Sequence, residues 1–136
     1  MKDIPVFLRR LVLRRAAGRC EYCRLAQAGQ EATFHIDHII PRADGGKTTA
    51  DNLALACVSC SLRKGARRIV TDAHTGIAVN LFHPRADVWE EHFVWEDVRL
   101  VGLTAAGRAT VDALEMNRPL ILAIRAEEAL LGRHPA

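Results

Sequence analysis

The chain has 136 residues, 49% of them hydrophobic, and a formal net charge of +3 at pH 7. These values fit a single domain over residues 1–136 with an ordinary core, and they exclude a disordered chain. Because the apolar runs are far shorter than the ~20 residues that span a bilayer and no secretory leader pattern begins the chain, we expect a soluble, cytoplasmic protein with no membrane partner.

The first half of the chain predicts a helix and then a strand pair followed by a second helix. Apolar residues recur at helical spacing after Pro5, which predicts a helix over about residues 4–17 that ends at Gly18. Residues 33–40 are β-branched and apolar, as in a strand, and Pro41 and a glycine-containing loop at residues 44–46 close it. Residues 52–56 form a short returning strand, and residues 61–67 are typical of a short helix.

The second half predicts two hairpins and two helices. Short strands near residues 68–71 and 77–82 flank a turn at residues 72–76, and a second strand pair, 93–95 and 99–101, flanks Glu96-Asp97. Thr104 is a candidate N-cap for a helix to about Asn117, and Pro119 forces a break before a second helix that ends near Gly132. The predicted fold class is therefore α+β, with the apolar C-terminal helices closing the core.

All four cysteines belong to two Cys-x-x-Cys pairs, Cys20 with Cys23 and Cys57 with Cys60. Each such turn can aim two thiolates at one ion, and two turns complete the tetrahedral shell that Zn²⁺ prefers. The alternatives are two disulfides, which a cytoplasmic location disfavours, or a redox-active dithiol, which would need only one pair. A site closed by four thiolates leaves no position for a substrate, so the predicted zinc ion is structural.

Further motifs lie between and just after the cysteine pairs in a recognisable order. Asp37-His38 is followed by Pro41, by Gly45-Gly46, by Asn52-Leu53 and, after the second pair, by Lys64. Together these elements resemble the HNH endonuclease family over residues 20–65, about a third of the chain. The resemblance implies a small ββα-metal core stapled by the four-cysteine zinc site, with a flanking N-terminal helix and a C-terminal extension over residues 70–136.

The resemblance also implies a role for each polar residue of the motif. His38 would be the general base that takes a proton from the attacking water, and the side-chain carbonyl of Asn52 would accept the other ring N–H of His38. Asp37 would bind a catalytic divalent cation, Mg²⁺ or another, distinct from the zinc. Taken singly, each residue has a structural explanation, such as a strand histidine or a turn-capping acid, but their order between the cysteine pairs favours function.

The residue directly after the last cysteine departs from the family pattern. That position is commonly His or Asn and serves as a second metal ligand, whereas here it is Ser61, a weak ligand for Mg²⁺. We expect His83 to approach Asp37 and share the catalytic cation, with His92 as the second candidate. The alternative for both histidines is simple packing against backbone carbonyls.

The predicted function is that of a metal-dependent endonuclease that hydrolyses phosphodiester bonds in DNA. A basic block without acids supplies candidate phosphate contacts, together with the arginines of the first helix. This block comprises Arg63, Lys64, Arg67 and Arg68. One alternative, which Ser61 favours, is a zinc-knuckle module that binds nucleic acid without cutting it. Another is a redox protein, which would leave Asp37, His38 and Asn52 unexplained.

Overall fold

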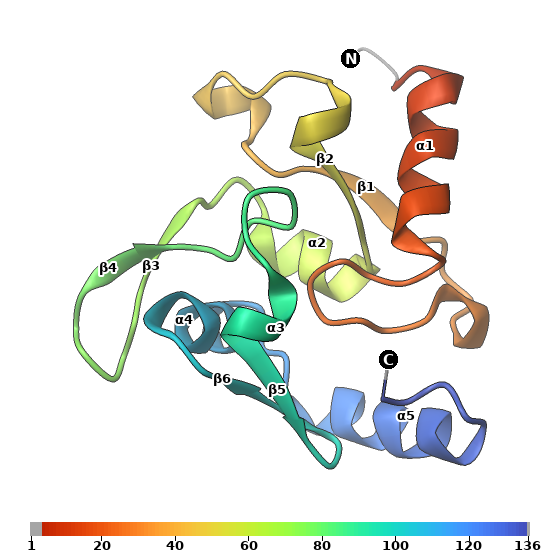
Figure 1. The fold of residues 1–136 in the computed structure, drawn as a ribbon, viewed down its shortest axis with the longest axis vertical. Helices are drawn as coiled ribbons and strands as arrows, with labels where there is room; N and C mark the ends of the chain where they lie inside the picture. The colour runs from red at the N-terminus through yellow and green to blue at the C-terminus, as the bar shows by residue number, and fades with distance from the viewer. Residues whose placement is uncertain (1–3, 136) are drawn as a thin grey trace.

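The computed structural model describes residues 4–135. Its first half contains α1 (Val6–Ala16), β1 (His35–His38), β2 (Leu53–Ala56) and α2 (Val58–Lys64). Its second half contains β3 (Ile69–Thr71), β4 (Ala78–Asn80), α3 (Trp89–His92), β5 (Phe93–Glu96), β6 (Arg99–Gly102), α4 (Ala105–Ala113) and α5 (Pro119–Leu130). This order confirms the predicted α+β fold class (Figure 1).

The functional motif folds as a ββα unit. Strands β1 and β2 are antiparallel, with His35 opposite Ala56 and His38 opposite Leu53, and α1 packs beside β2 (Figure 1). Helix α2 begins three residues before its predicted start, because the Cys57 sulfur caps it by accepting the N–H of Cys60. The cysteine pair therefore forms the first turn of the helix rather than a loop before it.

The C-terminal extension follows the predicted order, with two differences. Strands β3 and β4 pair with each other, as do β5 and β6, so both predicted hairpins are confirmed. The single turn of α3 was not predicted. Helix α4 ends at Ala113 rather than near Asn117, because Glu115 takes a left-handed conformation and the Asn117 amide is bonded to the backbone of Leu100.

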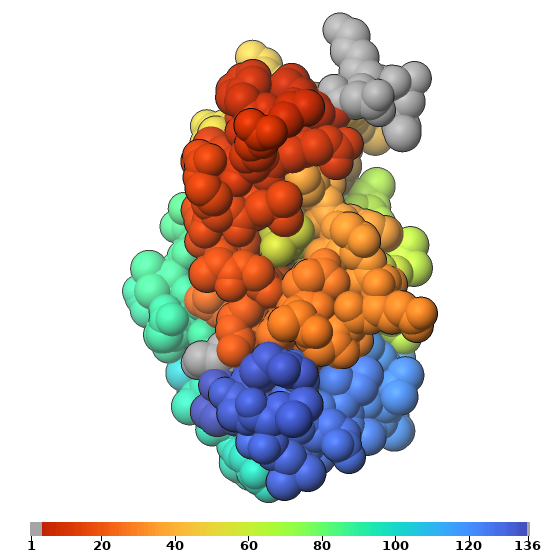
Figure 2. All heavy atoms as spheres, turned by 90° about the vertical axis from the view of Figure 1, so that its right-hand side faces the viewer, coloured from red at the N-terminus to blue at the C-terminus, as the bar shows by residue number. Residues whose placement is uncertain are grey.

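One hydrophobic cluster joins the two halves of the chain. It includes the buried side chains of Val12 in α1, Leu55 in β2, Phe93 in β5 and Ile121 in α5. Figure 2 shows the C-terminal helix directly beneath the segment that follows α1. Part of α5 thus closes the core as predicted, although Leu130 at its end stays 82% exposed. Within residues 4–135, no helix combines the length and apolar character needed to cross a membrane.

Candidate active site

The two cysteine pairs converge on one point. All four side chains are buried, and their sulfur atoms lie within 4.8 Å of one another. The Cys23 and Cys57 sulfurs, one from each pair, are 3.7 Å apart. Zinc–sulfur bonds of about 2.3 Å in a tetrahedron place the sulfurs about 3.8 Å apart, so the cluster fits a zinc ion.

The thiols of this cluster perturb one another strongly. Contacts with Cys20 and Cys23 lower the pKa of Cys57, while contacts within the same cluster raise the pKa values of Cys23 and Cys60. Four thiols this close cannot all ionise without a cation, and a divalent metal ion would stabilise all four as thiolates. Since both pairs meet at one centre, a separate redox role for either pair has no support in the geometry.

Asp37 lies on β1, and its two hydrogen-bond donors come from segments that also carry the cysteine pairs. The Tyr22 hydroxyl, between Cys20 and Cys23, donates to Asp37 Oδ2 at 2.7 Å. The Lys64 ammonium, four residues after Cys60, lies 3.1 Å from the same oxygen. Burial raises the pKa of the Asp37 carboxyl, while Lys64 and Tyr22 act in the opposite direction.

Lys64 was predicted to contact phosphate, but its side chain is buried. Its side chain is only 2% exposed, and its ammonium also donates to the His38 carbonyl at 3.0 Å. An ammonium buried in an ion pair cannot neutralise a phosphate on the surface. Lys64 instead holds α2 against the end of β1, which fixes the backbone that carries both Asp37 and His38.

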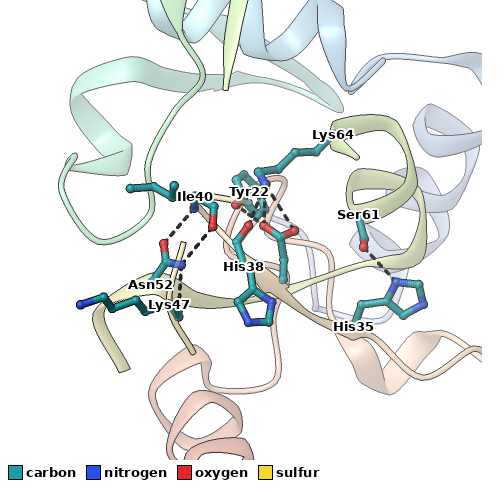
Figure 3. Close-up of polar contacts among 9 residues, drawn as sticks. Tyr22, His35, His38, Ile40, Lys47, Asn52, Ser61 and Lys64 are labelled. Carbon is teal, nitrogen blue, oxygen red and sulfur yellow. Dashed lines mark hydrogen bonds and ion pairs between the residues drawn. The ribbon is translucent and has the colours of Figure 1, made fainter. Parts of the chain in front are cut away.

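His38 directs its ring away from Lys64 (Figure 3). Its Nε2 accepts a hydrogen bond from Arg42 Nε at 3.3 Å and lies 2.9 Å from the Thr48 hydroxyl oxygen. A guanidinium only donates, so Nε2 carries a lone pair and the ring proton sits on Nδ1. Burial, followed by the Arg42 charge, lowers the pKa of His38. The imidazole is therefore held neutral, as a general base at neutral pH requires.

Asn52 does not make the expected hydrogen bond with the His38 ring. Its Oδ1 accepts the Ile40 N–H at 2.8 Å, and its Nδ2 donates to the carbonyls of Ile40 and Lys47 at 3.1 and 2.8 Å (Figure 3). The side chain is buried and closes the loop between β1 and β2. Because this loop also carries Arg42 and Thr48, Asn52 acts on His38 only through the residues that contact its ring.

Asn52→Ala should therefore lower stability as well as activity. Three partly buried hydrogen bonds are lost and their backbone partners lose a polar contact, so we expect the free energy of unfolding to fall by about 2 to 3 kcal/mol. Urea unfolding measures this loss, and Asp51→Ala, at the exposed neighbouring position, is the control. Equal stability of the two variants would contradict a loop-closing role for Asn52.

The buried cysteine cluster followed by an acid and a neutral histidine on one ββα unit invites comparison with known families. Residues 20–67 match the family model of the HNH endonucleases. The match confirms the resemblance seen in the motifs and places an HNH domain over about a third of the chain. Comparisons with curated proteins and with solved structures gave no match.

Ser61, the residue directly after the last cysteine, contacts a histidine, His35. Ser61 Oγ lies 2.9 Å from His35 Nδ1 (Figure 3), and both residues line an open hollow that also contains Asp37 and His38. Apart from the cysteines, the described residues contain no group of three or more His, Cys, Asp or Glu placed to hold a metal. The Asp37 carboxylate in this hollow fits a Mg²⁺ ion that takes one ligand from the protein and its other ligands from water and phosphate.

His83 does not line the hollow at Asp37, and its predicted role as a metal ligand remains a prediction. It lines two neighbouring cavities, and its Nδ1 accepts the backbone N–H groups of Arg85 and Ala86 at 3.1 and 3.0 Å. The ring proton therefore sits on Nε2, which could bind a metal only after losing both backbone contacts at Nδ1. These contacts weigh against a cation shared with Asp37.

The other arginines near the end of the HNH domain differ in how available they are to nucleic acid. Arg63 forms a salt bridge with Glu115 at 3.0 Å, and Arg67 donates to the Ala113 carbonyl at 3.1 Å. Arg68 is exposed directly before β3. Arg42, which contacts His38, was missed from the sequence because it is isolated between β1 and β2, outside the basic block and the first helix.

Proposed function

We propose that the protein is a metal-dependent endonuclease that hydrolyses phosphodiester bonds in DNA. The observation that carries this proposal is the His38 imidazole, which is neutral and offers its Nε2 lone pair beside a guanidinium at the edge of an open hollow. A base of this kind suits proton transfer from water. The HNH domain match supports nuclease chemistry as the class of reaction.

In the proposed reaction, His38 Nε2 takes a proton from a water molecule that attacks the phosphorus atom, and the 3′-oxygen leaves. The water would approach Nε2 from the hollow, where it displaces the contact with Arg42 or Thr48. The Arg42 guanidinium, freed from the ring, would then contact a non-bridging phosphate oxygen. Asn52 keeps both loop residues in place through its bonds to Ile40 and Lys47.

Asp37 is the residue that would hold the catalytic cation, which we propose to be Mg²⁺ or a similar divalent ion. Such an ion would neutralise charge that develops on the phosphate and on the leaving oxygen. Lys64 and Tyr22 fix the Asp37 carboxylate, and Lys64 reduces its negative charge. Because a partly neutralised carboxylate attracts a cation less, we expect the free protein to bind Mg²⁺ weakly and the phosphate of the substrate to strengthen the site.

A binding module that does not cut is the second candidate. The observation that favours it is Ser61, whose hydroxyl is occupied by His35 where many HNH domains have a stronger metal ligand. Such a module would use the exposed arginines on phosphates without any need for Asp37 or for a neutral His38. Binding without cleavage under every metal condition would favour this candidate.

A plasmid assay separates the two candidates. Supercoiled DNA is incubated with the protein under three conditions. The first contains Mg²⁺ or Mn²⁺, the second contains no added divalent ion, and in the third a chelator is added shortly before the DNA. We expect nicked and linear products only with added divalent ions, because the protein alone provides an incomplete ligand set. A gel shift without any nicking, on DNA or RNA and with either metal, would rule out the nuclease.

The pKa of His38 offers a test that does not depend on cleavage. The Arg42 charge is the second cause, after burial, of the lowered His38 pKa, so Arg42→Gln should raise that pKa and shift the neutral form toward higher pH. NMR titration of the His38 ring measures the change, and Arg42→Lys, which keeps the charge, is the control. An identical His38 pKa in the native chain and Arg42→Gln would contradict the assigned contact.

A further inference from the structure

A cavity of about 400 Å³ lies where the HNH domain meets the C-terminal extension. Its walls come from the residues after β1, from the end of α2, from the segment after β4 and from α3 and α4. A volume of this size is within the range of small-molecule sites. The residues that line it have a combination of chemistry that the proposed cleavage reaction does not use.

Two histidines line the cavity. His83 Nδ1 accepts two backbone N–H groups, so the ring proton of His83 sits on Nε2 and is a donor. His92 Nδ1 lies 2.6 Å from the Thr104 hydroxyl oxygen, which also accepts the N–H of Gly107. The described residues provide neither Nε2 with a hydrogen-bond partner.

The charges around the cavity favour an anion. Arg67 and Arg68 lie at its rim, and Lys64 contributes part of its wall, although the Lys64 ammonium is already bound to Asp37. The opposing acid in the lining is Asp87, which accepts the backbone N–H of His83 at 2.9 Å. Guanidinium groups beside neutral N–H donors are the groups that bind phosphate oxygens in proteins.

Most of the remaining lining is apolar. The apolar part comprises Ile39, Leu81, Phe82, Ala86 and Ala106, together with Ile40, and Asn80 is the polar exception. Phe82 is only 2% exposed, so it forms the floor of the cavity rather than its rim. A phosphate group joined to a flat, largely apolar ring is the chemistry of a nucleotide, and pockets that accept single bases use donors and packing of this kind.

The cavity shares no lining residue with the hollow at His38, but Lys64 connects the two. Lys64 lines the cavity and donates to the His38 carbonyl, and Ile39, which also lines the cavity, directly follows His38 in the chain. We propose that this cavity is a nucleotide subsite, which receives one nucleotide turned out of the strand next to the phosphate at His38. The part of this proposal in which the nucleotide belongs to a DNA strand rests on the proposed nuclease function.

A substrate preference follows from the cost of turning a nucleotide out of a duplex. Unstacking and unpairing a base costs a few kcal/mol of free energy. This cost is lowest where the base is mismatched or already single-stranded. We therefore expect faster cutting of DNA that has unpaired nucleotides beside the cut than of a fully paired duplex. A nucleotide within a DNA strand and a free deoxynucleotide offer the cavity the same phosphate and ring. Binding of each to the cavity therefore needs its own measurement.

Calorimetry with the full chain and no added Mg²⁺ tests the subsite itself. Deoxynucleoside monophosphates should bind more tightly than inorganic phosphate or a nucleoside, since each of those offers only half of the contacts. Ala86→Trp, which places a large ring at the cavity, should weaken binding by at least about tenfold. Ala123→Trp, at an exposed position on α5, is the matched control and should bind normally. Because Ala86→Trp could disturb folding, His92→Phe, which removes both ring nitrogens and keeps an aromatic ring, provides a second variant.

The source of the nucleotide is tested with DNA that carries a fluorescent purine analogue beside the cut. Its fluorescence should change on binding to the native chain and stay unchanged with Ala86→Trp, whether or not the strand is then cut. Nucleotide binding that persists in Ala86→Trp and His92→Phe but disappears in His38→Ala would overturn the subsite. Cutting without nucleotide binding would overturn the subsite alone, whereas nucleotide binding at the cavity without cutting would support the subsite and reject the nuclease.

Discussion

His38→Ala should abolish cleavage while DNA affinity stays nearly the same. The substitution removes the only group that we assign to deprotonate water, and loss of a general base lowers rates by roughly 10²- to 10⁴-fold. The phosphate contacts come from arginines elsewhere on the surface, so binding has no need of the imidazole. Plasmid nicking measures the rate, and fluorescence anisotropy with labelled DNA measures affinity.

Two controls separate a chemical role of His38 from a structural one. His74→Ala removes an exposed histidine in the turn after β3 and should cut normally. Added imidazole should restore part of the activity of His38→Ala, because a small base in solution can enter the space of the missing ring. A variant that still cuts at the native rate, or that loses DNA binding together with cleavage, would contradict the assignment.

The four-cysteine cluster and the order of the elements could be predicted from sequence because the signals are local. A Cys-x-x-Cys turn has the same geometry in most surroundings, so the two pairs alone define a four-thiolate site. The strand pair and both hairpins likewise follow from residue pattern and turn chemistry. The predicted start of α2 was wrong because Cys57 also caps this helix. The spacing of the cysteines does not reveal this capping role.

The contacts of the site could not be predicted because they depend on tertiary packing. Lys64 stands in a basic block that looks solvent-exposed, and only the approach of α2 to Asp37 explains its burial. Asn52 has both donors and acceptors, and its partner Ile40 lies 12 residues away. Which groups it bonds is decided by the path of the loop, so a histidine and a backbone carbonyl are equally possible partners on sequence grounds.

Loss of the proposed zinc ion from the four-cysteine cluster should have the largest effect on the protein as a whole. Cys57→Ser removes one of four thiolates, and structural zinc sites in small domains supply much of the folding free energy, about 10–16 kcal/mol in zinc-finger peptides. Cys57 is also the cap of α2, and a serine can still accept the Cys60 N–H, so the expected loss comes from the metal site and not from the cap. We expect one zinc ion per native chain by elemental analysis and an insoluble or unfolded Cys57→Ser protein.

The effect should reach Asp37 because both of its donors depend on the cysteine pairs. Tyr22 lies within the first pair and Lys64 at the end of the helix that the second pair begins, so a chain without zinc would release the carboxylate that we propose as the ligand of the catalytic cation. Leu62→Ser, which places the same side chain at a 70% exposed position of α2, is the matched control and should fold with one zinc ion. Purified native protein that is folded and free of zinc would contradict the prediction. A folded Cys57→Ser protein with an intact Tyr22–Asp37 hydrogen bond would show that the acid is positioned independently of the metal.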